Sequence, residues 1–254
     1  MEFNVIYVIV AREFKKFIRE RSRLFSAIAR PLLWLFIVGA GISRLVPRDT
    51  GVSYSQFIFP GILGMTILFS SIFSSISIIW DKEFGFMKEI LVAPVSRLSI
   101  VIGKALSGTI VSTIQAAIIL ALFPVIGFKL SLLQIISVII ICTSVSFCIS
   151  AFGIVLATFY ESYESFSVIM NFIIMPMFFL SGAMYPVRLL PDILRIVAKL
   201  NPLTYGIDAM KHAIFPHETG HMGPDFSIMT SATVIILTSI VFVLIAGKAF
   251  ERKG

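Results

Sequence analysis

The chain alternates between long uncharged apolar runs and shorter polar segments. A helix needs about 20 residues to cross a bilayer. The apolar runs predict six spans, over residues 24–46, 57–80, 99–127, 132–159, 166–184 and 226–247. The first is the least regular, because Arg30 must reach the headgroup layer or be shielded by neighbouring helices. We therefore predict an all-α integral membrane protein with six transmembrane helices, in which residues 1–254 form one domain.

The N-terminal segment, residues 1–23, has the periodicity of an amphipathic helix. One face holds Phe3, Ile6, Val10, Phe14 and Phe17, and the other holds Arg12, Lys15, Lys16 and Arg19. Such a helix rests in the headgroup region of a membrane. The charges follow the apolar residues, which is not the order in a cleaved signal peptide, so we predict an interfacial helix that is retained.

A second amphipathic stretch, residues 83–92, lies between two uncharged runs. Phe84, Met87 and Leu91 fall at helical spacing, and Pro94 ends any helix that starts near Glu83. Two interpretations stay open for it. It is either a loop helix that packs against its own bundle or a docking element for another protein.

The stretch over residues 185–215 is moderately polar and broken by prolines. Within it, Asp192–Leu200 and Leu203–Phe215 are helical by pattern, but both are too short and too charged to cross a bilayer. We predict a helical hairpin that is interfacial or re-entrant.

Composition and charge support a membrane protein of defined orientation. Of the residues, 57% are hydrophobic and 14% are charged, whereas a soluble domain has about 25% charged residues. With the N-terminus inside, 14 of the 21 Lys and Arg residues fall on the inner side. Because cytoplasmic loops are enriched in these residues, we predict both termini and residues 83–92 in the cytoplasm and residues 185–215 outside. The net charge of +7 then needs no nucleic acid as partner.

Two spans carry residues suited to a transport pathway. They are Phe69, Ser70, Phe73 and Ser74 in the second span, and Asn171, Met175, Phe178 and Phe179 in the fifth. Serines allow helices to approach closely and also line polar paths. Met and Phe form an adaptable surface for a greasy substrate, and they equally face lipid or a core. Both interpretations stay open for each residue.

The sequence holds no motif for nucleotide hydrolysis or catalysis. It has no G-x-x-x-x-G-K-[ST] loop, no H-E-x-x-H and no G-x-S-x-G. Apart from the irregular first span, the predicted spans hold no carboxylate that could bind a proton or sodium ion to drive transport. Energy for uphill transport must then come from a partner, and we predict neither enzymatic activity nor a metal or cofactor in this chain.

A few remaining polar residues have simple interpretations. The three histidines of residues 212–225 either bind a metal ion or lie in a solvated loop. Asp208 and Lys211 are explained most simply as an ion pair on a helix surface. Cys142 and Cys148 fall on different helix faces, so we expect no disulfide between them.

Four stretches carry a resemblance to a known family. They read EFGFMKEILVAPVSR (83–97), LSGAMYPV (180–187), LLPDIL (189–194) and LNPLTYGIDAMK (200–211). In this order they resemble the membrane subunit of type-two ABC exporters, in particular the branch with the daunorubicin-resistance and nodulation-factor export permeases. The resemblance implies a half-transporter that forms a homodimer, with a separate ATPase subunit that binds ATP and Mg²⁺ under each half.

The resemblance also implies roles for particular residues. The coupling helix that binds the ATPase would comprise Glu83, Phe84, Gly85, Phe86, Met87, Lys88, Glu89, Ile90 and Leu91, followed by Pro94 and Arg97. The external hairpin that caps the pathway would include Tyr185, Pro186, Asn201, Pro202, Tyr205 and Asp208. The second and fifth spans would line the pathway, and the N-terminal helix would be a second ATPase contact. The resemblance does not cover residues 212–225.

The nature of the cargo is left open. The first hypothesis is ATP-driven export of a hydrophobic or amphiphilic substrate, such as a drug, a lipid or a lipid-linked molecule, with membrane lipid as a further partner. The second is a polysaccharide or lipooligosaccharide permease of the same family. The third, of another class, is a membrane-bound lipid-modifying enzyme that uses the external hairpin. Co-purification with a nucleotide-binding protein separates the transporters from the enzyme.

Overall fold

The chain folds mainly into helices in the computed structural model, which describes residues 2–20, 29, 31–42, 53–92, 94–127, 129–215 and 223–251. Over these ranges it contains no strand. The helices are α1 (Phe3–Arg19), the π-helix η1 (Trp34–Val38), α3 (Gly39–Ile42), α4 (Tyr54–Ser74), α5 (Ile76–Glu83), α6 (Phe86–Val92), α7 (Arg97–Leu120), α8 (Leu132–Phe159), α9 (Tyr163–Phe179), the 3₁₀ helix η3 (Val187–Leu189), α10 (Asp192–Leu200), α11 (Pro202–Ile214) and α12 (Ile228–Glu251).

Four helical stretches are long and apolar enough to cross a membrane. They are Tyr54–Glu83, which joins α4 and α5, and Arg97–Leu120, Leu132–Phe159 and Ile228–Glu251. The prediction of an all-α membrane protein is thereby confirmed. Of the other predicted spans, 166–184 corresponds to α9, which ends earlier, at Phe179, because the chain turns at Gly182 with a φ of 75°. The predicted span 24–46 falls partly outside the described residues.

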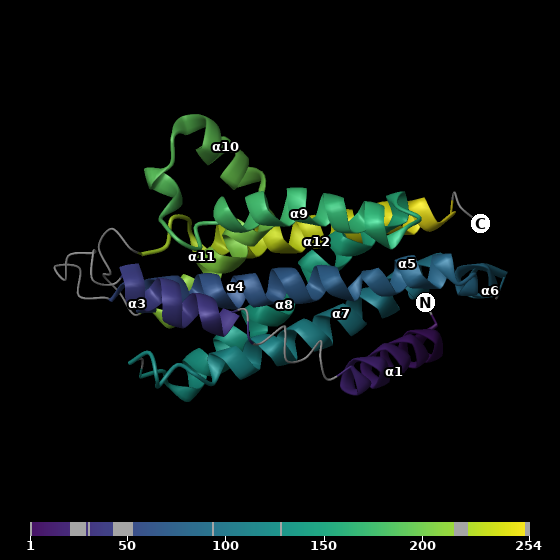
Figure 1. Ribbon diagram of the computed structural model, residues 1–254, viewed down its shortest axis with the longest axis horizontal. Coiled ribbons are helices and arrows are strands. Elements are labelled where there is room, and N and C mark those ends of the chain that lie inside the picture. Colours follow the sequence, from purple (N-terminus) through teal and green to yellow (C-terminus); the bar gives the residue numbers. More distant parts are fainter. Residues whose placement is uncertain are drawn as a thin grey trace.

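The long helices form a bundle with two distinct ends (Figure 1). Helix α8 packs against α4, α7 and α12. Helix α7 also packs against α4 and α12, and α1 packs along α7. One end carries α5, α6, the start of α1 and the C-terminal end of α12, and the opposite end carries α3, α10 and α11. We refer to them as the α6 end and the α11 end. Both chain termini lie at the α6 end.

Helix α4 lies at the centre of the bundle, where small residues let its neighbours approach. The Ser71 hydroxyl oxygen is 3.0 Å from the Ser112 hydroxyl oxygen of α7 and 3.4 Å from the Ser146 carbonyl oxygen of α8. A Cβ atom added at Gly108 of α7 would lie 2.7 Å from the Ser150 hydroxyl oxygen. Within one copy of the chain, these small residues therefore serve close helix packing.

Helix α1 uses its apolar face differently from our expectation. Ile6 and Phe17 are buried, together with Glu13, where α1 packs on α7. A Cβ atom added at Gly103 of α7 would lie 3.2 Å from Ile9, so the glycine makes room for α1. Part of the face that we predicted to rest on the membrane thus contacts α7, whereas Phe3 of the same face is 78% exposed.

The predicted hairpin consists of two helices with different surroundings. Helix α10 is largely exposed, and Ile193 is 77% accessible. Helix α11 is buried among α4, α8 and α12. Asp208 and Lys211 on α11 are only 3% and 1% exposed, so the interpretation of these two residues as an ion pair on a helix surface is wrong. Their charges are instead bonded inside the protein.

Candidate functional site

The α6 end carries a short helix, α6, that has exposed side chains. Gly85 has a φ of 78°, a conformation that favours glycine, and it separates α5 from α6. In α6, Met87 is buried against the bundle, while Phe86 is 50% exposed and Val92 is 86% exposed. Glu89 is exposed beside them. Helix α6 therefore presents an apolar surface with a carboxylate that the described residues of this chain do not cover.

The predicted helix 83–92 needs a correction at its start. It begins at Phe86, because Glu83 still belongs to α5 and Phe84 and Gly85 form a turn. Phe84 is 73% exposed while Met87 is buried, so these two side chains do not share a face as the spacing suggested.

The other predicted coupling residues have mixed positions. The backbone of Lys88, Ile90 and Leu91 is helical, but their side chains lie outside the described part. Pro94 is exposed after α6, and Arg97 is partly buried at the start of α7. These two residues thus flank the connection from α6 to α7.

A network of charges, in which Asp81, Lys104 and Glu13 are buried and Arg12 is half-exposed, holds α5 against α1 and α7. Asp81 of α5 accepts hydrogen bonds from Arg12 of α1 and Lys104 of α7, each over 2.7 Å. Lys104 also donates to Glu13 of α1 over 2.7 Å and to Ser77 over 3.1 Å. Buried charges are costly unless they are paired in this way. Burial lowers the pKa of the Arg12 guanidinium, but the hydrogen bond and charge of Asp81 outweigh it and raise the pKa overall.

The sequence alone does not reveal these pairs, because Arg12 and Asp81 are 69 residues apart and Glu13 and Lys104 are 91 apart. The one available signal is that charged residues at the edge of an apolar run need partners. That signal marks Asp81 and Lys104 without identifying what they bind.

The two residues after Asp81 contact other helices. Lys82 donates to the carbonyl oxygens of Ala157, Thr158 and Tyr160, at the C-terminal end of α8, over 2.6, 3.2 and 2.8 Å. Glu83 accepts a hydrogen bond from the backbone N–H of Tyr163, the first residue of α9, over 2.9 Å. Glu83, which we predicted to contact an ATPase, is thus engaged within this chain.

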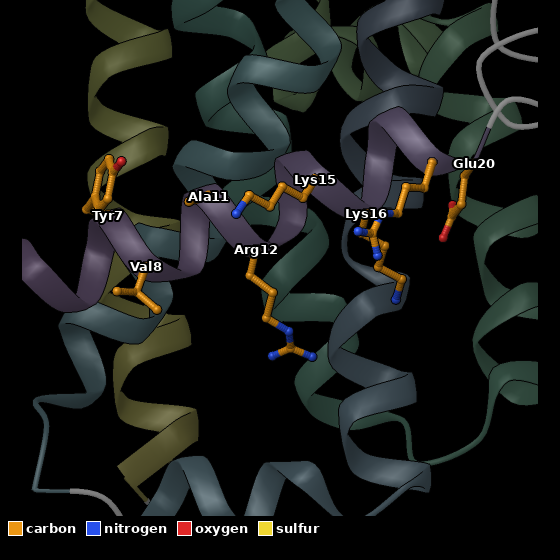
Figure 2. A pocket seen from close by; sticks show the side chains of 8 residues that line it. Tyr7, Val8, Ala11, Arg12, Lys15, Lys16 and Glu20 are labelled. Atoms are coloured by element: carbon orange, nitrogen blue, oxygen red, sulfur yellow. The ribbon is translucent and has the colours of Figure 1, made fainter.

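A groove of about 670 Å³ runs along α1 (Figure 2). It is lined by Tyr7, Val8, Ala11, Arg12, Lys15, Lys16, Arg19 and Glu20. The Lys16 ammonium also lies 4.3 Å from the centre of the Trp80 ring, a cation–π contact with α5. The groove combines four basic side chains with the aromatic and aliphatic surface of Tyr7 and Val8.

The predicted pathway residues face several directions. On α4, Ser70 is buried and Ser74 is partly buried, and the partly buried Phe69 and Phe73 stack with ring centres 6.4 Å apart. On α9, Phe178 is buried with its ring edge against Trp34, whereas Asn171, Met175 and Phe179 are exposed. One copy of the chain therefore offers the exposed side of α9 to its surroundings and keeps most of α4 inside.

The predicted hairpin residues contribute mainly structural contacts at the α11 end. Asn201 caps α11 by accepting from the Leu203 N–H over 3.0 Å, and Pro202 occupies the first turn. The Tyr205 hydroxyl donates to the Lys199 carbonyl oxygen over 2.8 Å. Pro186 is buried and Tyr185 is partly buried before η3.

The two buried charges of α11 bind mainly backbone and hydroxyl groups. Asp208 accepts hydrogen bonds from the N–H groups of Asp225 and Phe226 and from the Ser231 hydroxyl. Lys211 donates to the Gly182 carbonyl oxygen over 2.9 Å. Burial raises the pKa of Asp208 and lowers the pKa of Lys211. These contacts join α11 to the segments on either side of it.

The minor predictions have separate outcomes. Cys142 and Cys148 are both free and buried, so the expectation of no disulfide is confirmed. His212 lies 2.8 Å from the Phe226 carbonyl oxygen, and the other two histidines of residues 212–225 lie outside the described part. Among the described residues, no group of three or more His, Cys, Asp and Glu side chains is arranged to hold a metal ion.

The long apolar helices define a membrane-embedded protein. A family model described as "ABC-2 type transporter" matches residues 4–215. The chain therefore belongs to the ABC-2 type transporter family, and the predicted resemblance to type-two ABC permeases is confirmed.

Three relatives illustrate the similarity to individual proteins. The chain is 31% identical over 258 residues to the putative transport permease ycf38 of Cyanophora paradoxa, an alignment that covers 97% of this chain and 88% of the relative. It is 29% identical over 200 residues to nodulation protein J of Rhizobium leguminosarum bv. trifolii, with 77% and 75% covered. It is 26% identical over 249 residues to the inner membrane transport permease YadH of Escherichia coli strain K12, with 95% and 93% covered. The chain is thus similar to proteins named as transport permeases over most of its length.

Proposed function

We propose that this chain is the membrane subunit of an ATP-driven exporter and that a separate ATPase subunit binds to α6. The observation that supports this most directly is the exposed surface of Phe86, Glu89 and Val92 on a helix fixed to the end of the bundle. The sequence holds no phosphate-binding loop of its own. Hydrolysis of ATP with Mg²⁺ is then the work of the partner, and α6 receives the resulting movement.

Site-specific cross-linking tests the docking site. A photoreactive amino acid at Phe86 should yield a covalent product with a protein that carries a phosphate-binding loop. The matched control is the same amino acid at Ile193, which is 77% exposed on α10 near the opposite end. An ATPase product at Ile193 and none at Phe86 would contradict the proposal.

The proposed orientation places both termini and α6 in the cytoplasm and α10 outside. It rests on the excess of Lys and Arg in the segments that lie at the α6 end. Cys142 and Cys148 of α8 are the two cysteines of the sequence. Replacing both by Ala therefore gives a cysteine-free background. In that background Ile193→Cys should react with a membrane-impermeant thiol reagent in intact cells, and Val92→Cys only after the membrane is opened. If Val92→Cys reacts in intact cells and Ile193→Cys only in opened membranes, the orientation is the opposite of the one proposed.

A second copy of the chain is the proposed partner in the membrane. The exposed side of α9, with Val168, Phe172 and Met175, is mainly apolar, with Asn171 as a polar member, and is not covered by the described helices of this copy. Two such faces would enclose a pathway whose walls suit a hydrophobic or amphiphilic cargo. The mass of the complex in nanodiscs distinguishes one copy from two, and a single copy that transports would refute the pairing.

Membrane lipid is a further proposed partner, and the groove on α1 supports it. Its basic side chains Lys15 and Arg19 match the phosphate of an anionic headgroup, and Tyr7 and Val8 match the apolar part of a lipid.

The class of cargo is tested by measuring how candidate substrates stimulate ATP hydrolysis in the reconstituted complex. Separate measurements with amphiphilic drugs, phospholipids and glycolipids distinguish the candidate classes of cargo. If the rate of ATP hydrolysis is the same with all three and without any of them, none of these classes is the cargo.

A further inference from the structure

Three consecutive charged residues at the end of α5 each contact a different part of the bundle. Asp81 reaches α1 and α7 through Arg12 and Lys104. Lys82 reaches the last turn of α8, and Glu83 reaches the first turn of α9. The residues that immediately precede α6 are thus bonded to four other helices.

The contacts of Lys82 and Glu83 satisfy groups that helices leave unpaired. The last carbonyl groups of a helix and its first N–H groups have no partner within the helix. A cation is favourable at the carbonyl end and an anion at the N–H end. Lys82 supplies the cation to α8, and Glu83 supplies the anion to Tyr163 of α9. Neighbouring residues of α5 therefore fix both sides of the α8–α9 corner.

The turn between Glu83 and α6 is itself hydrogen-bonded to α5. The Phe84 N–H donates to the Trp80 carbonyl oxygen over 2.9 Å, and the Gly85 N–H donates to the Lys82 carbonyl oxygen over 3.1 Å. A displacement of α6 is therefore passed to α5 instead of being absorbed by a loose linker.

Helix α9 is held at its two ends and along one narrow stripe. The stripe consists of Phe166, Met170, Ile174 and Phe178, spaced by four residues. Beyond Glu83 at its start, α9 is held near its other end by Asn201, whose side-chain amide donates to the Met177 carbonyl oxygen over 2.6 Å. A helix attached in this way can tilt about its far end when its first turn is displaced.

We propose that Lys82 and Glu83 are positioning residues that transmit the movement of α6 to α9, and that Glu83 does not bind the ATPase. This rests on the proposed function, in which the ATPase moves α6. The hydrogen bond from the Tyr163 N–H to Glu83 is the link through which α9 follows. Lys82 keeps the C-terminal end of α8 in a fixed position relative to α5.

The Tyr163 N–H can be removed without changing the charge of the site. Tyr163 is the first residue of α9, where proline is favoured, and Ser162 before it has an extended conformation that a following proline tolerates. Tyr163→Pro therefore deletes the donor and keeps the helix start. Tyr163→Ala is the matched control, because it keeps the N–H. Glu83→Ala removes the acceptor, and Glu83→Gln keeps an acceptor oxygen.

The readout is the distance between spin labels at Val168→Cys on α9 and Ile240→Cys on α12, in the cysteine-free background, with and without ATP and vanadate. In the complex with its ATPase, we expect Tyr163→Pro and Glu83→Ala to lower the population with the ATP-dependent distance about tenfold, the size expected for one hydrogen bond to a charged group. Tyr163→Ala and Glu83→Gln should keep that population. All four variants should retain ATP hydrolysis and the cross-link at Phe86.

Each other outcome overturns the inference in a recognisable way. If Tyr163→Pro and Tyr163→Ala behave alike, the hydrogen bond does not transmit movement. If Glu83→Ala loses the cross-link at Phe86, Glu83 is an ATPase contact. If the chain with the photoreactive amino acid at Phe86 and no substitution at Glu83 or Tyr163 shows no cross-link to an ATPase, the proposed function fails and the inference fails with it.

Discussion

The two ends of the bundle hold their buried charges in different ways. At the α6 end, the buried Asp81, Lys104 and Glu13 pair across three helices, and the half-exposed Arg12 also binds Asp81. At the α11 end, Lys211 binds a backbone carbonyl group, and Asp208 binds backbone N–H groups and a hydroxyl. The buried charges of the α6 end therefore depend on how three helices are placed relative to one another, whereas those of the α11 end hold the backbone segments that flank α11.

Breaking the charge network at the α6 end should have the largest effect on stability. Lys104→Met leaves the buried carboxylates of Asp81 and Glu13 without their shared partner, which should destabilise the fold by about 3–5 kcal/mol. Thermal unfolding in detergent measures this. Adding Glu13→Gln should recover part of the loss, because one unpaired charge is removed. An unfolding midpoint that stays at the wild-type value would show that the network is not important for stability.

At the α11 end, the sharpest test is Asp208→Leu. It leaves the N–H groups of Asp225 and Phe226 and the Ser231 hydroxyl without their acceptor, and we expect a loss of about 2–3 kcal/mol. The matched control is Asp192→Leu, since the Asp192 side chain is 91% exposed and surface pairs contribute little. Equal loss in both variants, measured by unfolding, would show that the buried contacts of Asp208 do not stabilise the α11 end.

Lys82→Met should have a smaller and more local effect. It removes the cation from the carbonyl groups of α8, at a cost of about 1–2 kcal/mol. Hydrogen exchange should then become faster for the amides near Ala157 and Tyr163 and stay unchanged in the centre of α8. Lys82→Arg should preserve most of the protection. A uniform increase along α8 would indicate global loosening instead.

The smallest effect on stability is expected for the groove on α1. The double change Lys15→Gln and Arg19→Gln should leave unfolding unchanged, because neither side chain belongs to the buried network. It should reduce the amount of anionic lipid that native mass spectrometry finds on the purified protein. Retention of anionic lipid at the wild-type level would rule out the groove as its binding site.

The sequence predicted some helices closely and misjudged others for definable reasons. Helix α8 matches the predicted bounds, because a long uncharged run leaves a single interpretation. The start of α6 was misplaced, because Gly85 adopts a positive φ that periodicity does not report. The burial of Asp208 and Lys211 was missed, because charges inside a short helix resemble a solvated surface until their partners are known.

The candidate site could be predicted only in part. The stretch over residues 83–97 was one of four that carried the family resemblance, and the family assignment followed from them correctly. The partners of Asp81, Lys82 and Glu83 lie between 23 and 80 residues away along the chain. Such pairings depend on how the helices assemble, and a single sequence does not encode them in any local pattern.

The burial of α4 has a consequence for how such a subunit changes in evolution. Because Ser71 of α4 and Ser112 of α7 are enclosed by their own copy, larger side chains there would force the helices apart. The exposed side of α9, with Asn171, Phe172 and Met175, has no such constraint from its own copy. Selection for an altered cargo range is therefore expected to collect its substitutions on α9 and to leave the serines of α4 and α7 untouched.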